Sequence, residues 1–280
     1  TVRCTEKHPV SLSGTWNVVE NTPNILTLDQ CDYYFDGEFQ EENGYVLNIQ
    51  NRACELKRAV KIKQIYHVDV RFVPNEIYLL CETPQIYKLS INGKNTEMCD
   101  CGWAFDRSFR KIDISGVLEQ GRNEICLECD FVQSDKVYQD IETSKIFESE
   151  KNKLAYDTEI EPIYLYGNFS VWALGEFEEL KNSAVRCQSG FIIDKPVNEV
   201  SLENIERQGF LFFSGKLTLE KQFESDGSPC SIRLCRTGIN AVELNINGKA
   251  LPTSIWNGDM IDLSSYVNKG TNTIRFTLIN

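Results

Sequence analysis

The sequence predicts an all-β protein made of two antiparallel β-sandwich domains in tandem, preceded by an N-terminal connecting arm. Three observations predict this fold class: many short segments alternate apolar and polar residues with period two, turn residues separate these segments, and part of the chain repeats itself. Helix-like stretches are short, at 201–207 and 141–153. A β/α barrel is excluded, because eight strand–helix units would consume all 280 residues.

The predicted strands recur across an internal repeat. Residues 61–92 overlay residues 216–247 without a gap, and in both copies Asn-Gly-Lys follows directly on the last apolar residue of the run. Alternation with period two points one set of side chains into a core and the other into water. Leu89 and Leu244 fall at the same inward position. We therefore expect both copies to form the same kind of double-layered sheet.

Turn residues recur at matching places in the two copies. After a shift of about six residues, 112–129 falls on 261–278. The Asn-Gly dipeptide in each copy supplies the positive φ angles of a tight hairpin turn, and a Gly-x-Asn turn leads into each last strand. Asp113 and Asp262 occupy equivalent positions. This recurrence predicts a shared structural role for the two aspartates.

Composition divides the chain into three expected parts. We expect an arm at 1–55 that packs on the first sandwich, the first sandwich at 56–182 and the second at 183–280. The boundary falls in the polar segment 178–183, which follows the strand-like segment 163–172. The first 55 residues have no counterpart in the second copy, so the arm docks either on the first sandwich or on a further upstream domain.

Charge and cysteine content limit the partners and the compartment. The net charge of -12 repels a phosphate backbone, so nucleic acid is not an expected partner. No apolar run approaches the roughly 20 residues of a membrane helix, so no membrane partner is expected. Eleven cysteines, an odd number, favour a reducing compartment and a cytoplasmic location, with an extracellular one as the alternative. The start at Thr1 fits a fragment as well as a processed protein.

Several segments, in order, resemble the galactose-binding-like jelly-roll domains appended to large bacterial glycoside hydrolases, such as family 2 and the rhamnosidase-like families. These segments are 23–29, 82–94, 102–123, 163–169 and 208–215. Single pieces such as Asn-Gly-Lys mark turns in many β proteins, and their order carries the resemblance.

The resemblance implies a galactose-binding-like fold for both sandwiches and a non-catalytic, ancillary role. Its implied partners are carbohydrate and a catalytic domain of the same polypeptide. In such enzymes the catalytic carboxylates lie on a separate barrel domain that nothing here matches, so no catalytic residue is carried over. The alternatives are a stand-alone carbohydrate-binding module and an adhesion or assembly module, against which free cysteines weigh.

The first copy exceeds the second by about six residues between Thr96 and Phe109. Sugars present apolar C–H faces and polar rims, so an exposed Trp beside charged groups suits them. The alternative is that the aromatic residues of this loop pack against another domain or the arm. One further Trp holds the analogous position in the second copy, where we favour simple packing. The candidate carbohydrate-binding residues are Trp103, Phe105, Asp106, Arg107 and Trp256.

Cysteine pairs at Cys99-x-Cys101 and Cys126-x-x-Cys129 suggest zinc, which needs four ligands around one point. The strand register places Cys126 and Cys129 on opposite faces, so we expect free thiols and no metal site. No cofactor is expected. A structural Ca²⁺ is compatible with folds of this type, although no segment spells a calcium loop. His8 and His67 belong to no nucleophile motif, which argues against a histidine-dependent hydrolase.

Overall fold

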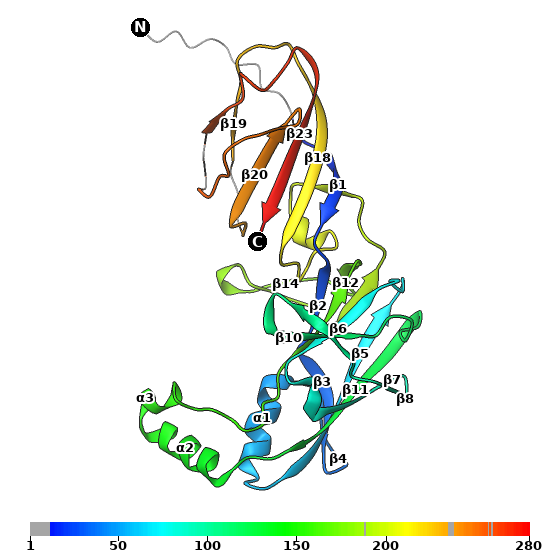
Figure 1. The fold of residues 1–280 in the computed structure, drawn as a ribbon, viewed down its shortest axis with the longest axis vertical. Helices are drawn as coiled ribbons and strands as arrows, with labels where there is room; N and C mark the ends of the chain where they lie inside the picture. The colour runs from blue at the N-terminus through cyan, green and yellow to red at the C-terminus, as the bar shows by residue number, and fades with distance from the viewer. Residues whose placement is uncertain (1–11, 188, 235–237, 257, 259) are drawn as a thin grey trace. The chain divides into compact units, whose positions relative to one another are not determined.

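A computed structural model describes residues 12–187, 189–234, 238–256, 258 and 260–280. The chain is mostly β, in antiparallel sheets, which confirms the predicted all-β fold class (Figure 1). Two compact units form. The central unit comprises 25–168 and 173–195, and the terminal unit comprises 169–172, 196–280 and the described residues up to Asn24.

The central unit contains two main sheets. The β12 sheet has the order β2 (Asn24–Leu28), β12 (Ile163–Gly167), β6 (Ile77–Cys81), β10 (Asp106–Asp113) and β9 (Asp100–Ala104). The β5 sheet includes β16 (Phe191–Asp194), β5 (Val60–Val70), β11 (Gly121–Phe131), β7 (Tyr87–Ile91) and β8 (Lys94–Thr96), with β3 (Gln30–Phe35) paired to β5 and β4 (Glu38–Tyr45) paired to β3. A small ribbon joins β14 (Glu178–Glu179) to β15 (Val185–Arg186).

The core of the central unit lies between these sheets. Alternate residues of β5 and β11 are buried, and so are Ile77, Leu79 and Cys81 of β6. Burial, first of all, raises the pKa of Tyr66 of β5 well above its usual value, and Cys81 of β6 is among the neighbours that raise it further, so the inner faces of the two sheets meet. Period-two alternation thus predicted which side chains form this core.

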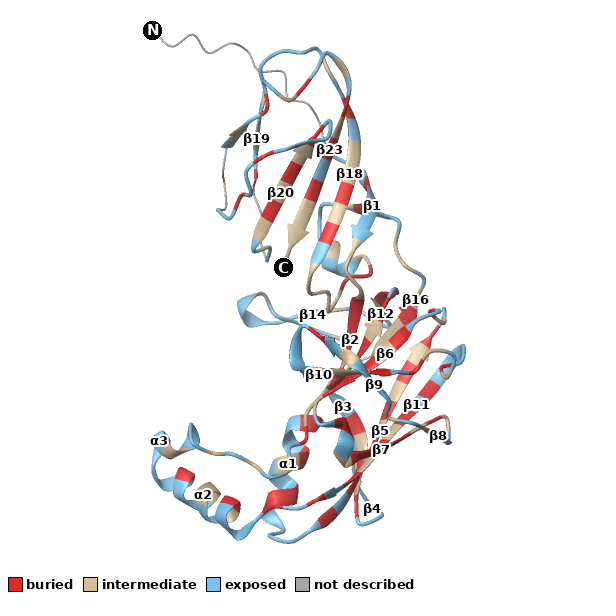
Figure 2. Ribbon diagram, in the orientation of Figure 1, coloured by how far each residue is buried: buried red, intermediate tan, exposed pale blue. Residues whose placement is uncertain are grey.

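The terminal unit has a sheet with the order β17 (Glu199–Ser201), β1 (Thr15–Asn21), β18 (Lys216–Ser225), β23 (Gly270–Ile279), β20 (Ala241–Ile246) and β21 (Lys249–Ala250). A ribbon of β19 (Ser231–Arg233) and β22 (Met260–Asp262) accompanies it. Most of β13 (Ser170–Ala173) also belongs to this unit, where Val171 forms a parallel bridge with Phe210. Figure 2 shows the alternation as red and tan bands along β18, β20 and β23.

Helices are few, and they differ in part from the expectation. The predicted stretch 141–153 overlaps α2 (Asp135–Ile146) and α3 (Glu148–Lys151), and 201–207 contains only a short 3₁₀ turn at Ile205–Arg207. Sequence reasoning missed α1 (Val46–Glu55). Its buried residues include Val46, Ile49 and Ala53, a helical spacing that was hidden inside the expected arm. No helix in the described ranges has the length and apolar character to cross a membrane.

The repeat extends to topology and register. The order β5-β11-β7-β8 in the central unit matches β18-β23-β20-β21 in the terminal unit. Leu89 is 4% exposed and lies opposite Leu127, while Leu244 is 2% exposed and lies opposite Phe276. The two leucines therefore occupy equivalent surroundings, as predicted.

Buried asparagines hold the same turn in both copies. The Asn123 side-chain oxygen accepts from Asn92 Nδ2 at 2.9 Å and from Glu119 N at 2.8 Å, and Asn123 Nδ2 donates to the carbonyls of Glu119 and Gly121. In the terminal unit Asn272 makes the corresponding four contacts to Asn247, Asn268 and Gly270. The Gly-x-Asn signal thus marks a complete hydrogen-bonded network rather than a turn alone.

The repeated aspartates also have the predicted shared role. Asp113 Oδ1 accepts from Ser115 N at 2.9 Å, and Asp262 Oδ1 accepts from Ser264 N at 2.9 Å. Each serine hydroxyl then accepts a backbone N–H from the facing segment, from Ile77 at 3.1 Å in one unit and from Cys230 at 3.2 Å in the other.

The first 55 residues do not form one arm, and the units do not follow the boundaries expected at 55/56 and 182/183. β1 pairs with β17 and β18 of the terminal unit, whereas β3 pairs with β5 of the central unit. β1 and β3 thus lie against the equivalent strands β18 and β5. Pairing uses backbone groups, so it leaves little sequence similarity between the strands that occupy one position.

Candidate functional site

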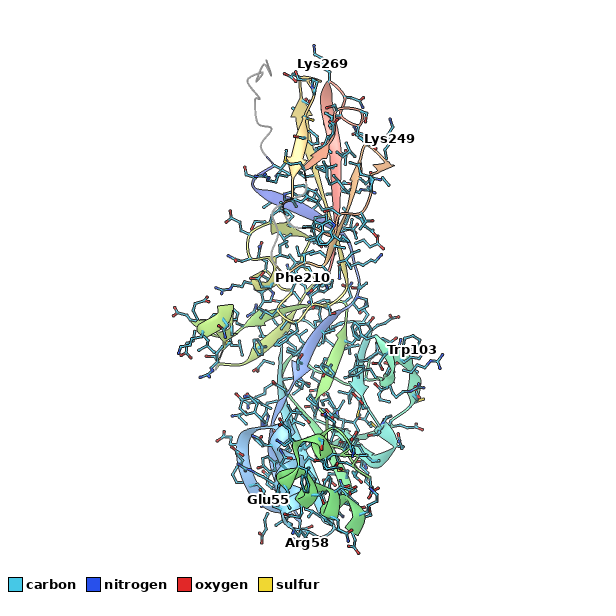
Figure 3. The ribbon with its side chains drawn as sticks, turned by 90° about the vertical axis from the view of Figure 1, so that its left-hand side faces the viewer. Glu55, Arg58, Trp103, Phe210, Lys249 and Lys269 are labelled. Carbon is cyan, nitrogen blue, oxygen red and sulfur yellow. The ribbon has the colours of Figure 1, made fainter. Side chains whose placement is uncertain are left out.

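The hairpin of β9 and β10 carries four of the five predicted site residues. Trp103 of β9 is 52% exposed and lies at the edge of its unit (Figure 3). In the ladder it stands opposite Arg110 of β10. Arg107 is also exposed. Within its unit, the hairpin therefore presents an indole and a guanidinium to solvent.

Asp100 fixes the strand that carries Trp103. Arg110 Nε donates to Asp100 Oδ2 at 2.8 Å, Arg110 Nη2 donates to the same oxygen, and Gly102 N donates to Oδ1 at 2.8 Å. These hydrogen bonds lower the pKa of the Asp100 carboxyl, and the bond from Arg110 has a larger effect than the bond from Gly102. The carboxylate is therefore ionised and engaged within the hairpin.

Asp106 has a comparable structural task. Its Oδ1 accepts from Ser108 N at 2.7 Å and from Ser108 Oγ at 2.6 Å, which lowers the pKa of the carboxyl. Such a short-range contact caps a turn. Asp106, which the sequence offered as a sugar-contacting residue, thus uses its Oδ1 to hold the turn of the hairpin.

Aromatic rings from the hairpin and from β12 meet on the outer face of the β12 sheet, to which β9 and β10 themselves belong. Phe105, with φ of 65°, meets Tyr166 edge-on at 5.7 Å, and Phe109 meets Tyr164 edge-on at 5.6 Å. Leu80, an outward residue of β6 opposite Tyr164, is 1% exposed. We call Phe105, Phe109, Tyr164 and Tyr166 the aromatic face.

Sequence reasoning missed three of these four rings. Tyr164 and Tyr166 alternate with the buried Ile163 and Leu165. Period two alone therefore places both tyrosines on the outside of the sheet, where polar residues are the rule. Two tyrosines at outward positions depart from this rule, and the sequence alone could have indicated an aromatic outer face here.

Several carboxylates lie near Tyr164 of the aromatic face. Burial raises the pKa of Glu82, and the charges of Asp106 and Glu159 raise it further. The pKa of Glu161 is raised by burial and then by Glu82 and Glu159. Burial raises the pKa of Tyr164, and the charges of Glu161, Glu82 and Asp29 raise it further. Asp29 is therefore a further neighbour of this ring. These shifts show carboxylates that lie close together in a partly desolvated place.

The fifth predicted residue, Trp256, belongs to the terminal unit and is described there by itself. It is 70% exposed, beside the exposed Ile255. The simple packing favoured for it is therefore not seen within this unit. Its neighbour Asn257 lies outside the described residues.

Metal-ligating side chains do not converge in the described part of the chain. No group of three or more His, Cys, Asp or Glu side chains there is arranged to hold a metal ion. Cys129 is buried and Cys126 half-buried on the other face of β11, while Cys99 and Cys101 are exposed. The nine described cysteines are free thiols.

Comparisons with known proteins found likeness only among solved structures. No family model and no curated protein matches the chain. An α-L-rhamnosidase from Streptomyces avermitilis, complexed with L-rhamnose, matches 96% of this chain over 25% of its own, at 10% identity and a TM-score of 0.34. A GH2 β-galacturonidase from Eisenbergiella tayi, bound to galacturonate, matches 97% over 39%, at 8% identity and a TM-score of 0.33.

A β-D-mannosidase from Dictyoglomus thermophilum matches 92% of this chain over 31% of its own, at 13% identity and a TM-score of 0.32. These three structures are glycoside hydrolases, and this chain spans between a quarter and two fifths of the length of each.

Proposed function

We propose that this chain is a non-catalytic ancillary region of a glycoside hydrolase, which orients or completes a catalytic domain outside these 280 residues and contacts carbohydrate. The observation that carries the proposal is the exposed aromatic hairpin on a β-sandwich. Trp103 of β9 and Phe105 of the turn between β9 and β10 both keep about half of their surface exposed, on a hairpin that Asp100 and Asp106 hold in place. An indole face suits the apolar C–H face of a sugar ring.

The proposal predicts no hydrolysis by the chain alone. Two carboxylates with raised pKa, Glu82 and Glu161, lie beside aromatic rings, which is a composition that glycosidases also use. Turnover of aryl glycosides by the purified chain therefore tests the proposal directly. We expect no release above a buffer control. Turnover that Glu82→Gln or Glu161→Gln abolishes would overturn the non-catalytic role.

The size of the native polypeptide is the second test. An antibody against this chain, applied to an extract of the source cells, should detect a polypeptide much larger than 32.1 kDa. A native product of 32.1 kDa would contradict an ancillary region and favour a stand-alone carbohydrate-binding module.

Exposed tryptophans in both units, Trp103 and Trp256, are the observation that favours this second candidate. Glycan-array binding separates the two functions. Strong binding that Trp103→Ala abolishes supports a dedicated binding module, whereas millimolar binding supports the orienting role, because a small sugar buries little surface. Trp256→Ala removes the indole of the other unit, which is 70% exposed against 52% for Trp103, and shows whether strong binding requires both tryptophans.

A further inference from the structure

Two exposed thiols, Cys99 and Cys101, lie together at the edge of the β12 sheet, and we call them the thiol pair. Cys101 belongs to β9, the last strand of that sheet, and Cys99 directly precedes the strand. Side chains two residues apart along a strand lie on the same side. Cys101 Sγ donates to the backbone carbonyl of Cys99 at 3.5 Å, which holds this sulfur beside its neighbour. The two thiols therefore form a pair rather than two isolated groups.

The two sulfurs also influence each other's ionisation. The charge of Cys101 raises the pKa of the Cys99 thiol more than any other cause does, ahead of desolvation and of the charges of Glu97 and Asp100. Two thiolates side by side repel each other, and a cation bound between them removes that repulsion. The thiol pair is therefore suited to exchange its protons for a cation.

The carboxylate between the two cysteines does not enlarge this ligand set. Asp100 uses both of its oxygens within the hairpin: Oδ2 accepts from Arg110 and Oδ1 accepts from Gly102. Among the residues that the structure describes, no third His, Cys, Asp or Glu joins the pair in an arrangement for a metal ion. A structural zinc site takes four ligands. Cu⁺ prefers soft sulfur donors and forms linear complexes with two thiolates, so the ligand number of the thiol pair favours Cu⁺.

An ammonium group on the same face of the sheet also favours a monovalent ion. Cys101 follows Asp100, whose ladder partner Ile112 is buried inside the unit, so Cys101 projects to the outer face. Lys111 projects to that face too, since its Nζ lies 4.6 Å from the centre of the ring of the outward Tyr78. Two thiolates and one Cu⁺ keep one negative charge, which an ammonium on the same face stabilises. A divalent ion would leave the complex neutral and forgo this attraction.

We propose that the thiol pair binds one Cu⁺ ion between the sulfurs of Cys99 and Cys101. Each thiol gives its proton to solvent and forms one sulfur–copper bond, and no electron is transferred, so the ion stays Cu⁺. The site goes beyond the proposed function, because neither cysteine is among the candidate carbohydrate-binding residues.

Competition with bicinchoninate measures the affinity of the full, reduced chain for Cu⁺, supplied without oxygen as its acetonitrile complex. Cys99→Ser and Cys101→Ser should each weaken the tightest site about a hundredfold or more, because a second sulfur tethered nearby acts at a high effective concentration. Both thiols are exposed, so both variants should keep the fold, which circular dichroism checks. Cys126→Ser is the matched control and should leave the affinity unchanged, because Cys126 and Cys129 lie on opposite faces of β11 and cannot hold one ion together.

Three results would each overturn the inference. The first is an unchanged Cu⁺ affinity when both cysteines are replaced by serine. The second is a Zn²⁺ affinity that falls in this double variant as far as the Cu⁺ affinity does, since a pair of thiolates alone should not select zinc. The third is a Cys99–Cys101 disulfide that peptide mapping finds after equilibration in an excess of reduced glutathione, which would assign the pair to a covalent bridge.

Discussion

Replacement of Asn123 by Ala should destabilise the central unit strongly. The side chain is fully buried and makes four hydrogen bonds, with lengths from 2.7 to 3.1 Å. Each bond contributes about 1 kcal/mol net, so the expected loss is about 4 kcal/mol. A domain of ordinary stability has about 5–15 kcal/mol in all. The Tm should fall by on the order of 10 °C.

Amide hydrogen exchange followed by mass spectrometry locates the effect, and urea unfolding measures it. Exchange should accelerate in β7 and β11, the strands that this network joins, and Asn272→Ala should do the same to β20 and β23. Asn95→Ala is the matched control, because Asn95 lies in the neighbouring β8 with its side chain exposed. A decrease in unfolding free energy below about 1 kcal/mol for Asn123→Ala would refute the reasoning, because a single hydrogen bond would then explain the whole decrease.

Three further outcomes follow from the described contacts. Gly93→Ala should cost about 1 kcal/mol of unfolding free energy, because φ of 74° is left-handed and nothing else crowds the site; an unchanged urea midpoint contradicts this. Hydrogen bonds from Ser115 lower the pKa of the Asp113 carboxyl in the folded protein. The ionised carboxylate therefore stabilises the fold above the unfolded-state pKa, and this contribution is lost as pH falls through the folded-state pKa. Asp113→Asn should reduce the dependence of the unfolding free energy on pH below about pH 4. Burial raises the pKa of the Cys129 thiol to about 12, so iodoacetamide should modify the exposed Cys99 and Cys101 before Cys129. Equal labelling rates for the three thiols in the native protein would contradict the burial of Cys129.

The sequence predicted the strands through a local property, period-two alternation, and the repeat doubled that evidence. Leu89 and Leu244 were placed correctly because an inward position is fixed by its neighbours two residues away. The turns at Asn92 and Asn247 were also predicted, since Asn-Gly meets the φ requirement locally; these residues have φ of 51° and 53°.

Features that depend on distant partners were not predictable in this way. Asp106 was selected as a ligand-contacting group, yet its Oδ1 caps the turn at Ser108, and the sequence gives no preference between these roles. Tyr164 lies far along the chain from Phe109, and only the sheet order β12-β6-β10 brings their rings together. The aromatic face therefore had to be found in the structure, although the outward position of each tyrosine was readable.

The interleaved strands change what the repeat means for folding. Trp16 of β1 is 1% exposed and packs in the core of the terminal unit, 4.9 Å from Phe276 in ring-centre distance. A chain beginning at residue 183 would keep the whole second copy of the repeat and lose this ring and the strand paired to β18. A buried aromatic contributes several kcal/mol, a large share of a domain's stability. Sequence repetition thus identifies two similar sheets, but the unit that folds as a whole includes residues from both ends of the chain.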